Sequence, residues 1–365
     1  MLEKGRITYK QLILLIFLSR IVTSISFLPG LNEPPANQDI WLSDLLFFPI
    51  QLFLASPIYL LWKRFPDQTI IQYSQTIAGK VGKLVGLLII WYFLHYTAIT
   101  LAQYSFFLTS AVMPETPALF FMLSLILVCA YAARKGLEVI GRLSELFAPL
   151  IMISLILFLS LEVKDMNFKI LTPLLEKGIF PVFHGSLIAA SKTLEVLGLA
   201  MLLPYLNNRQ KVKPIFILSF ALISLYLVLL TLPVVTMLGL ELAKSSSFPC
   251  YSVIRLINVG DFLNRLESIH MAICSLGAFI KISFQYYLTV LGLSQLLELR
   301  EYKPLVLPIG ALLIPLSLLI GPNLVELQLF SSYKIFMGYS YFFILLIPSL
   351  LLLTAIIRRK GVRSK

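Results

Sequence analysis

Three cationic side chains lie inside long apolar stretches of this 365-residue chain: Arg20, Lys192 and Lys281. A charge at the centre of a membrane-spanning helix costs about 2.5–3.5 kcal/mol on insertion scales, so such residues face a protein interior or a water-filled cavity. In such a place an ammonium or guanidinium group can bind a carboxylate, a carbonyl oxygen or a titratable partner. The three cations therefore indicate where ligand or ion chemistry is to be sought.

Two of these stretches share a second feature, a polar interruption followed by a leucine–proline pair. Ser19-Arg20 precedes Phe27-Leu28-Pro29, and Ser191-Lys192-Thr193 precedes Leu202-Leu203-Pro204. Interrupted helices in corresponding places of two halves are the best sequence indication of a transporter-type binding site.

The composition requires a membrane protein around these residues. The chain is 58% hydrophobic and 13% charged, with a mean hydropathy of +0.89, whereas soluble domains are about 45–50% apolar and 25% charged. We predict an all-α polytopic fold in a single transmembrane domain over residues 1–365. Ten spans near the length that a bilayer requires are predicted at 11–29, 41–62, 84–110, 117–133, 143–162, 181–206, 215–240, 266–297, 304–321 and 336–357.

The ten spans divide as five plus five, so the two halves have opposite orientation, as an inverted repeat requires. The first repeat is expected at about 11–162 and the second at about 181–357. The basic N-terminal residues resemble the start of a signal peptide, but the apolar run is too long and lacks a cleavage site. We therefore expect an uncleaved first span.

Lysine and arginine predict the orientation of the spans. Of the 30 such residues, 20 lie in the N-terminal tail, the even-numbered connections and the C-terminal tail, and 7 lie in the odd-numbered connections. Basic loops remain in the cytoplasm, so both termini are predicted to be cytoplasmic. This placement accounts for the net charge of +12 and argues against a nucleic-acid partner. The basic C-terminal tail either is an orientation signal only or also contacts anionic lipid.

Two connections carry further structural signals. In 65–83, Ile70, Tyr73, Ile77 and Val81 recur at helical spacing, which indicates an interfacial helix that ends near Gly79. The connection 241–265 contains a serine-rich stretch followed by an amphipathic piece, which is expected to cover an outer vestibule.

The first span has two interpretations, both open from sequence alone. Its segment Val22-Thr23-Ser24-Ile25-Ser26 carries three hydroxyl groups, which can satisfy carbonyls freed by unwinding. It is either a broken helix whose exposed amides and carbonyls bind a small zwitterion, or a bent span whose hydroxyls bond back to the helix.

The sixth span carries Lys192 and Glu195, which are three residues apart and so share a helix face. One of them senses a ligand carboxylate, a ligand amine or a proton, or the two form a structural ion pair that neutralises both charges.

The eighth span places Lys281 and Gln285 on one face with Phe284 and Leu288. The Lys281 ammonium is predicted to stand where a transporter of this shape holds a sodium ion beside the first span, which suits proton coupling or no coupling. The alternative for Lys281, and equally for Arg20, is that the side chain extends to the membrane surface.

No feature indicates an enzyme, a metal site or a cofactor. The chain has no nucleotide-binding or metal-ligand motif and no nucleophile–base arrangement. His95, His184 and His270 lie on different spans, and packing or polar satisfaction is the expected role of each. The aromatic residues Trp91 and Tyr96 are read as core or lipid contacts rather than as a gate.

Seven segments together resemble the B subunit of bacterial spore germinant receptors, the spore-germination permease family of the amino acid–polyamine–organocation superfamily. An example is Gly-Leu-Glu-Val-Ile-Gly-Arg-Leu-Ser-Glu at 136–145. The segments are 65–80, 86–95, 136–145, 195–206, 248–257, 260–267 and 279–283. One departure is that family members usually carry glycine in the first-span break, where this chain has residues 23–26.

The resemblance implies the five-plus-five inverted-repeat transporter fold with broken first and sixth helices. It implies a mid-membrane site for an amino acid or sugar, a larger A-type membrane subunit and a C-type lipoprotein as partners, and the inner membrane of the spore as location. Ligand binding triggers germination on this reading, and the alternative is a proton-coupled secondary amino acid transporter. The ligand-site residues carried over are Thr23, Ser24, Ile25, Thr97, Thr100, Leu101, Thr193, Leu194, Glu195 and Gln285, with Lys192, Glu195 and Lys281 as charge or coupling residues.

Overall fold

The apolar stretches form helices because a backbone in lipid must satisfy its own N–H and C=O groups within each segment. The computed structural model describes residues 3, 5–28, 30–31, 33, 35–257 and 266–361, without the side chains of Thr23, Ile25 and Ser26. The spans of the first half are α1 (Tyr9–Ser26), α2 (Ile40–Arg64), α4 (Lys80–Phe107, continued by a π-helical turn at Leu108–Val112), α5 (Ala118–Lys135) and α6 (Leu137–Glu162).

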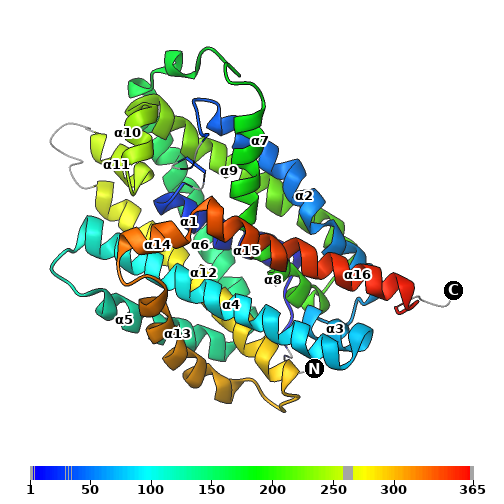
Figure 1. The fold of residues 1–365 in the computed structure, drawn as a ribbon. Helices are drawn as coiled ribbons and strands as arrows, with labels where there is room; N and C mark the ends of the chain where they lie inside the picture. Colours follow the sequence, from blue (N-terminus) through cyan, green and yellow to red (C-terminus); the bar gives the residue numbers. More distant parts are fainter. Residues whose placement is uncertain are drawn as a thin grey trace.

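The spans of the second half follow one another along the chain in the same order as their counterparts in the first half (Figure 1). They are α7 (Phe180–Ser191) with α8 (Glu195–Leu202), then α9 (Val212–Leu238), α12 (Leu266–Leu296), α13 (Val306–Ile320), and finally α15 (Gly338–Tyr341) with α16 (Ile347–Ile357). Among the described residues, eight helical stretches and the bent pair α7–α8 are long and apolar enough to cross a membrane. With the 18-residue α1, the predicted ten-span architecture is confirmed.

The helix contacts repeat between the two halves. Helix α1 packs on α9, and its counterpart α7 packs on α2. Likewise α5 packs on α12, and α13 packs on α4, while α4–α12 and α2–α9 join matching helices directly. Exchanging the halves therefore maps these particular contacts onto one another, as an inverted repeat requires. The exact repeat boundaries remain a prediction.

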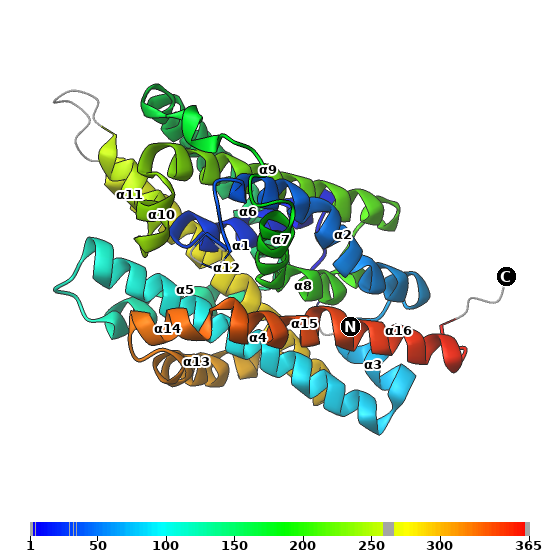
Figure 2. The same ribbon diagram turned by 45° about the horizontal axis from the view of Figure 1, so that its top comes forward.

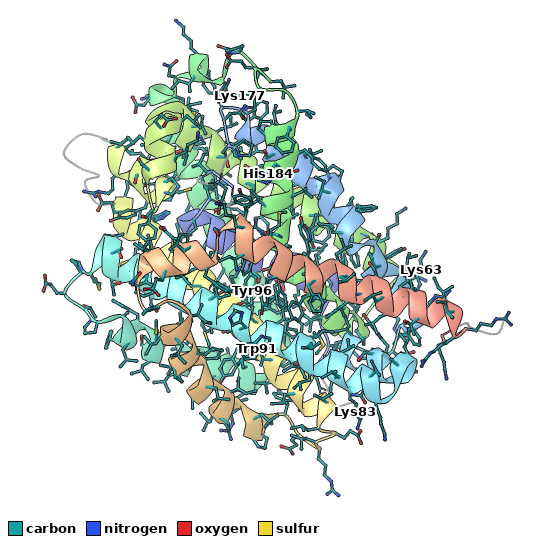
Figure 3. All side chains as sticks on the ribbon, viewed as in Figure 1. Lys63, Lys83, Trp91, Tyr96, Lys177 and His184 are labelled. Carbon is teal, nitrogen blue, oxygen red and sulfur yellow. The ribbon has the colours of Figure 1, made fainter. Side chains whose placement is uncertain are left out.

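Alternate connections gather at opposite ends of the bundle. The start of α1, the short helix α3 (Ile70–Ala78) and the end of α16 lie together at one end, and α10 (Leu240–Ser245) and α11 (Pro249–Leu256) lie at the other (Figures 1 and 2). Arg358 Nη1 donates to Ile77 O at 3.0 Å across the first end. Figure 3 places Lys63 and Lys83 at this end, Lys177 at the opposite end and Tyr96 between them.

The predicted short helix in 65–83 is present. Helix α3 begins at a capping box in which Thr69 and Gln72 exchange hydrogen bonds, and it is followed by its C-cap Gly79, with φ of 59°. Gly79 fits there because only glycine adopts positive φ without steric cost. Helices α10 and α11 cover the other end, and residues 258–265 of that connection lie outside the described residues.

Helix α12 is the central element of the bundle. Of its most apolar stretch, 83% is buried inside the protein, against 28% for α13. Helix α12 contacts α1, α4, α5 and α6, whereas α13 exposes most of its leucines. A charged residue in the middle of α12 is therefore placed among helices and not against lipid.

The two predicted helix breaks have different outcomes. The sixth span is interrupted at residues 192–194, between α7 and α8, which are bent by 44°. The first span is not interrupted at 22–26: α1 runs unbroken to Ser26 and ends there. No glycine or proline occurs between residues 9 and 26, and Pro29 disfavours helical geometry only in the residue before it.

A buried hydrogen bond joins the matching helices α2 and α9. Thr231 Oγ1 donates to Asp44 Oδ2 at 2.6 Å, and both residues are buried. We expect Thr231→Val to lower stability by about 1–2 kcal/mol, since a bond to a buried carboxylate is lost. The midpoint of thermal unfolding in detergent measures this. Thr354→Val, which removes a local hydroxyl bond to Leu350 O, is the control and should change little; equal effects would contradict the interpretation.

Candidate ligand site at the helix break

The Arg20 guanidinium lies at the break between α7 and α8. Arg20 is fully buried, and its Nη2 donates to Ala189 O at 3.1 Å, its Nε to Thr193 Oγ1 at 3.3 Å and its Nη1 to Ser24 Oγ at 2.7 Å. The C-terminal end of a helix carries partial negative charge, so the last turn of α7 attracts the cation. The side chain therefore ties α1 to α7 and does not extend to the membrane surface.

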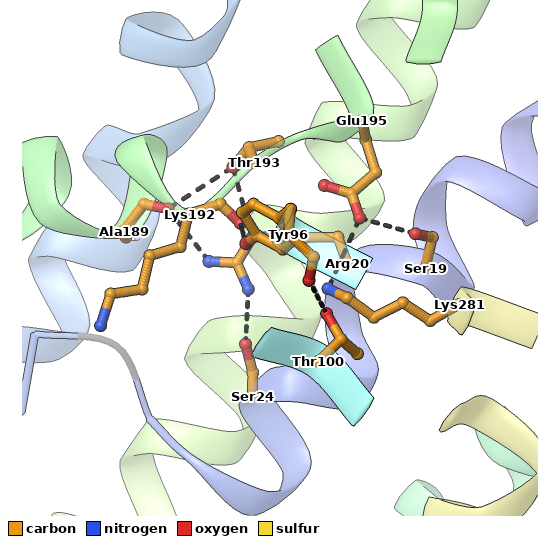
Figure 4. A network of polar contacts seen from close by, with 10 residues as sticks. All are labelled: Ser19, Arg20, Ser24, Tyr96, Thr100, Ala189, Lys192, Thr193, Glu195 and Lys281. Carbon is orange, nitrogen blue, oxygen red and sulfur yellow. Dashed lines mark hydrogen bonds and ion pairs between the residues drawn. The ribbon is translucent and has the colours of Figure 1, made fainter. Parts of the chain in front are cut away.

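Glu195, the first residue of α8, bridges to two other helices (Figure 4). Ser19 Oγ on α1 donates to Glu195 Oε1 at 2.6 Å, and Lys281 Nζ on α12 lies 3.7 Å from the same oxygen. Glu195 and Lys281 are both completely buried. The Lys281 ammonium also lies over the Tyr96 ring of α4, 5.5 Å from its centroid. One carboxylate thus connects α1, α8 and α12.

Carbonyl groups around the break are satisfied by side chains from other helices. Tyr96 OH on α4 donates to Lys192 O at 2.8 Å, and the Ser340 hydroxyl on α15 donates to Ser191 O. With the Arg20 bond to Ala189 O, three different helices, α1, α4 and α15, supply donors to this turn. These bonds replace the intrahelical bonds that the interruption removes, as a buried backbone requires.

Lys192 does not pair with Glu195, whose ion-pair partner is Lys281. The structural Lys192–Glu195 ion pair that their spacing suggested is therefore wrong. Figure 4 shows the Lys192 side chain extending away from Glu195. The break falls between the two residues, so the helix face that they would share does not exist. Lys192 is half-buried and lines a cavity that also contains Glu33.

The other predicted residues fall into three groups. Ser24 and Thr193 bind Arg20, and Leu194 directly precedes α8 in the core. Thr97 and Thr100 are buried on α4, but their hydroxyls donate to their own helix, at Phe93 O and Tyr96 O. Leu101 and Gln285 are completely buried on α4 and α12; the side chains of Thr23 and Ile25 lie outside the described part of the chain.

Several buried polar atoms near the ion pair have unused hydrogen-bonding capacity. Within the described part of the structure, Glu195 Oε2, Lys281 Nζ and both amide atoms of Gln285 have no hydrogen-bond partner. Buried polar groups in proteins are normally paired with protein or water, and each exception needs a reason. This capacity is what a polar ligand or a transferred proton would use.

Three contributors to the network were not assigned to it by sequence reasoning. Ser19 adjoins Arg20 but was not placed in the site, Tyr96 was read as core, and Ser340 carried no signal at all. Ser340 is one of several hydroxyl-bearing residues of the last span and stands between Tyr339 and Tyr341, and only the packing of α15 against the break reveals its role. The three histidines are separate, as expected: His95 Nδ1 lies 2.9 Å from Tyr339 OH, and the others make ring contacts.

Close helix approach at Gly198 holds the charged pair together. A Cβ atom at Gly198 on α8 would lie 2.5 Å from Phe284 Cζ and 3.3 Å from Leu288 Cδ1 on α12. Gly198 is one turn from Glu195, and Phe284 is one turn from Lys281. The absence of a side chain at Gly198 therefore sets the separation at which the ion pair forms.

The fold of the chain is that of a transporter. The crystal structure of MhsT in complex with L-phenylalanine superimposes with a TM-score of 0.66, covering 98% of this chain and 100% of that chain at 13% sequence identity. The class that fold and site define is thus an integral membrane protein with the five-plus-five inverted-repeat transporter fold.

The sequence places the chain more narrowly. The family model described as Spore germination protein matches residues 6–325, and the chain belongs to this family. It is 30% identical to Spore germination protein KB of Bacillus subtilis (strain 168), over 89% of this chain and 88% of that protein. It is 26% identical to Spore germination protein YndE of the same organism, over 84% and 85%, and 19% identical to Spore germination protein XB of Bacillus anthracis, over 73% and 75%.

Removing one member of the buried ion pair should be more harmful than removing both. We expect Glu195→Gln to destabilise the protein by about 3 kcal/mol or more, because Lys281 is left without a counter-charge, and the double variant with Lys281→Met to recover part of the loss. The exposed pair Lys83–Glu298, at 3.1 Å, supplies the control: Glu298→Gln should change stability by less than about 1 kcal/mol. A double variant less stable than both single variants would contradict this account.

Filling the space at Gly198 should separate α8 from α12. We expect Gly198→Ala to cost about 1–3 kcal/mol through overpacking against the buried Phe284 ring, and Phe284→Leu in the same chain to restore stability. Gly338→Ala is the control, because a Cβ at Gly338 meets no atom within 4 Å. Thermal unfolding in detergent tests the set, and an unaffected Gly198→Ala variant would refute the packing argument.

Proposed function

We propose that the chain is the membrane subunit of a nutrient receptor that starts the germination of a bacterial spore. The observation that carries the proposal is the buried network in which Arg20, Glu195 and Lys281 join both halves of the protein at the break in the sixth span. A small nutrient that binds there competes for the same polar atoms. The membership of the chain in the spore germination protein family supports this function.

The proposed mechanism is a shift between two conformations. In one conformation, that of this structure, Glu195 pairs with Lys281 and accepts a hydrogen bond from Ser19, and Arg20 donates a hydrogen bond to the end of α7. In the other, a bound amino acid or sugar replaces some of these contacts and α7–α8 moves relative to α1 and α12. A ligand shifts such an equilibrium only through its different affinity for the two states.

Partners and location complete the proposal. A larger A-type membrane subunit and a C-type lipoprotein read the conformational shift in the inner membrane of the spore. Both termini face the cytoplasm, since 20 of the 30 cationic residues lie at the terminal tails and even-numbered connections. The proposed ligand residues are those at the break and beside it, namely Thr23, Ser24, Ile25, Thr97, Thr100, Leu101, Thr193, Leu194, Glu195 and Gln285.

A second candidate is a proton-coupled amino acid transporter, favoured by the likeness to MhsT over 98% of the chain. The Lys281 ammonium, fixed between α1 and α8 by its ion pair with Glu195, would supply the positive charge that a bound cation supplies in a coupled transporter. Loss and gain of its proton would then accompany transport.

Deletion of the gene tests the receptor function. Spores that lack the chain should lose their response to at least one single nutrient, followed as the fall in refractivity after addition. Complementation with the native gene should restore the response, whereas Lys281→Met should leave it at least tenfold slower because the network loses its cation, although the protein still inserts. The exposed Lys83→Met is the matched control. Deletion spores that respond normally to every nutrient would refute the proposal.

Uptake separates the two candidate functions. Purified protein in liposomes, given labelled amino acid and an imposed pH gradient, should bind without concentrating the solute if the chain is a receptor. Robust concentrative uptake would instead establish the transporter.

A further inference from the structure

The carbonyl groups at the break are already occupied by the protein itself. In broken membrane helices these groups commonly coordinate a cation, and the free helix ends bind charged ligand groups. Here Arg20 Nη2 donates to Ala189 O, the Ser340 hydroxyl to Ser191 O and Tyr96 OH to Lys192 O. A ligand ammonium would have to displace these donors, so the charged ends of a ligand need other partners.

A cavity with such partners adjoins the break. It has a volume of about 300 Å³ and is enclosed by the segment after α1, by α4, by the segment that leads into α11 and by α14 (Leu324–Phe330). This is the small end of the range found for ligand pockets. Lys192, the first residue of the interruption, forms part of its wall, so the cavity and the break share a residue.

The cavity carries two opposite charges that are not joined to each other. Lys192 and Glu33 both line it, and no ion pair links them in the described part of the chain. Glu33 is held in place because its Oε1 accepts a hydrogen bond from the Tyr333 backbone N–H at 3.0 Å. Separated opposite charges around one small space match a molecule that carries both a carboxylate and an ammonium group.

The remaining lining is mixed. Its apolar part comes mainly from Phe27 and Leu28 after α1 and from Val325, Leu327 and Leu329 on α14, and its neutral polar side chains are Gln103, Ser247, Gln328, Ser331 and Ser332. A sugar carries neither charge, so it would leave Lys192 and Glu33 without ionic partners. A side chain of aliphatic or aromatic type would be in contact with apolar surface.

We propose that this cavity binds a free α-amino acid with an apolar side chain, with its carboxylate on Lys192 and its ammonium group on Glu33. The inference rests on the proposed function, and it moves recognition of the charged ligand groups from the break to this adjoining cavity. Because Lys192 belongs to the interruption itself, attraction of its ammonium group by the ligand carboxylate acts directly on the turn that Arg20, Tyr96 and Ser340 hold. In this way ligand binding is transmitted to the buried network of Arg20, Glu195 and Lys281.

Binding to the purified protein tests the recognition. Thermal stabilisation and calorimetric titration with L-alanine, L-valine, L-leucine, L-phenylalanine and D-glucose should show binding of at least one amino acid and none of glucose. The methyl ester of that amino acid lacks the carboxylate charge, and its N-acetyl form lacks the ammonium charge. Each should bind about tenfold more weakly or worse, since a hydrogen bond to a charged group is lost. Binding of glucose and of no amino acid would overturn the proposal.

Two variants assign each charge to its partner. Lys192→Gln should weaken amino acid binding about tenfold and abolish the preference for the free acid over its methyl ester. Glu33→Gln should abolish the preference for the free amine over its N-acetyl form, and its amide oxygen can still accept the Tyr333 N–H. Lys177→Gln, an exposed change at the same end of the bundle, is the control. Unliganded unfolding midpoints verify that the variants fold, and selectivities equal to those of the native protein would refute the assignment.

Failure of this site and failure of the proposed function are distinguishable. If spores lose a nutrient response on deletion of the gene but the purified protein binds no amino acid, the receptor function stands and the assigned cavity is wrong. If the amino acid binds with the predicted selectivities but deletion changes no response, the cavity assignment stands and the germination function is wrong.

Discussion

The rest of the structure depends on one constraint, that a charge buried among apolar helices must have a counter-charge or several hydrogen-bond donors and acceptors. Glu195 satisfies it for Lys281, and the end of α7 together with two hydroxyl groups satisfies it for Arg20. Apart from Ser24, which shares α1 with Arg20, each partner lies on a different segment from the charge that it compensates. The requirement to pair these charges therefore holds α1, α7–α8 and α12 in register with one another.

The same constraint makes the centre of the protein responsive. A network that is only partly satisfied, with Glu195 Oε2, Lys281 Nζ and the Gln285 amide lacking hydrogen-bond partners among the described residues, is poised to accept another polar group. Because the network joins both halves of an inverted repeat, any change in its pairing alters the relation of the halves. A receptor and a transporter of this fold use that coupling in different ways: a receptor reports the change to its partners, and a transporter moves solute through it.

Helix α12 shows how packing supports this chemistry. Gly198 and Gly277 lack the side chains that would push α8 and α1 away from α12, since a Cβ at Gly277 would lie 2.1 Å from Val22 Cγ2. The tight contacts leave the charged pair in a dry setting where electrostatic interactions are strong. The cavity beside Lys192 lies outside this dense region, so the cavity and the enclosed network are distinct environments joined through residues 192–194.

The sequence by itself determined the ten spans, the helix at 70–78 and the interruption of the sixth span, because hydropathy and helical period are local properties that lipid enforces strictly. It also marked Arg20, Lys192, Glu195 and Lys281, since charges are rare in such stretches. Only the tertiary structure decided their partners. Spacing suggested Lys192 for Glu195, but the break turns Lys192 toward the cavity and α12 brings Lys281 instead. Likewise the hydroxyls at 23–26 suggested a broken first helix, yet α1 continues to Ser26, because nothing in its own sequence stops it before Pro29. The donors for the break come from α1, α4 and α15, far apart in the chain, and no local pattern records contacts that exist only after the helices have packed.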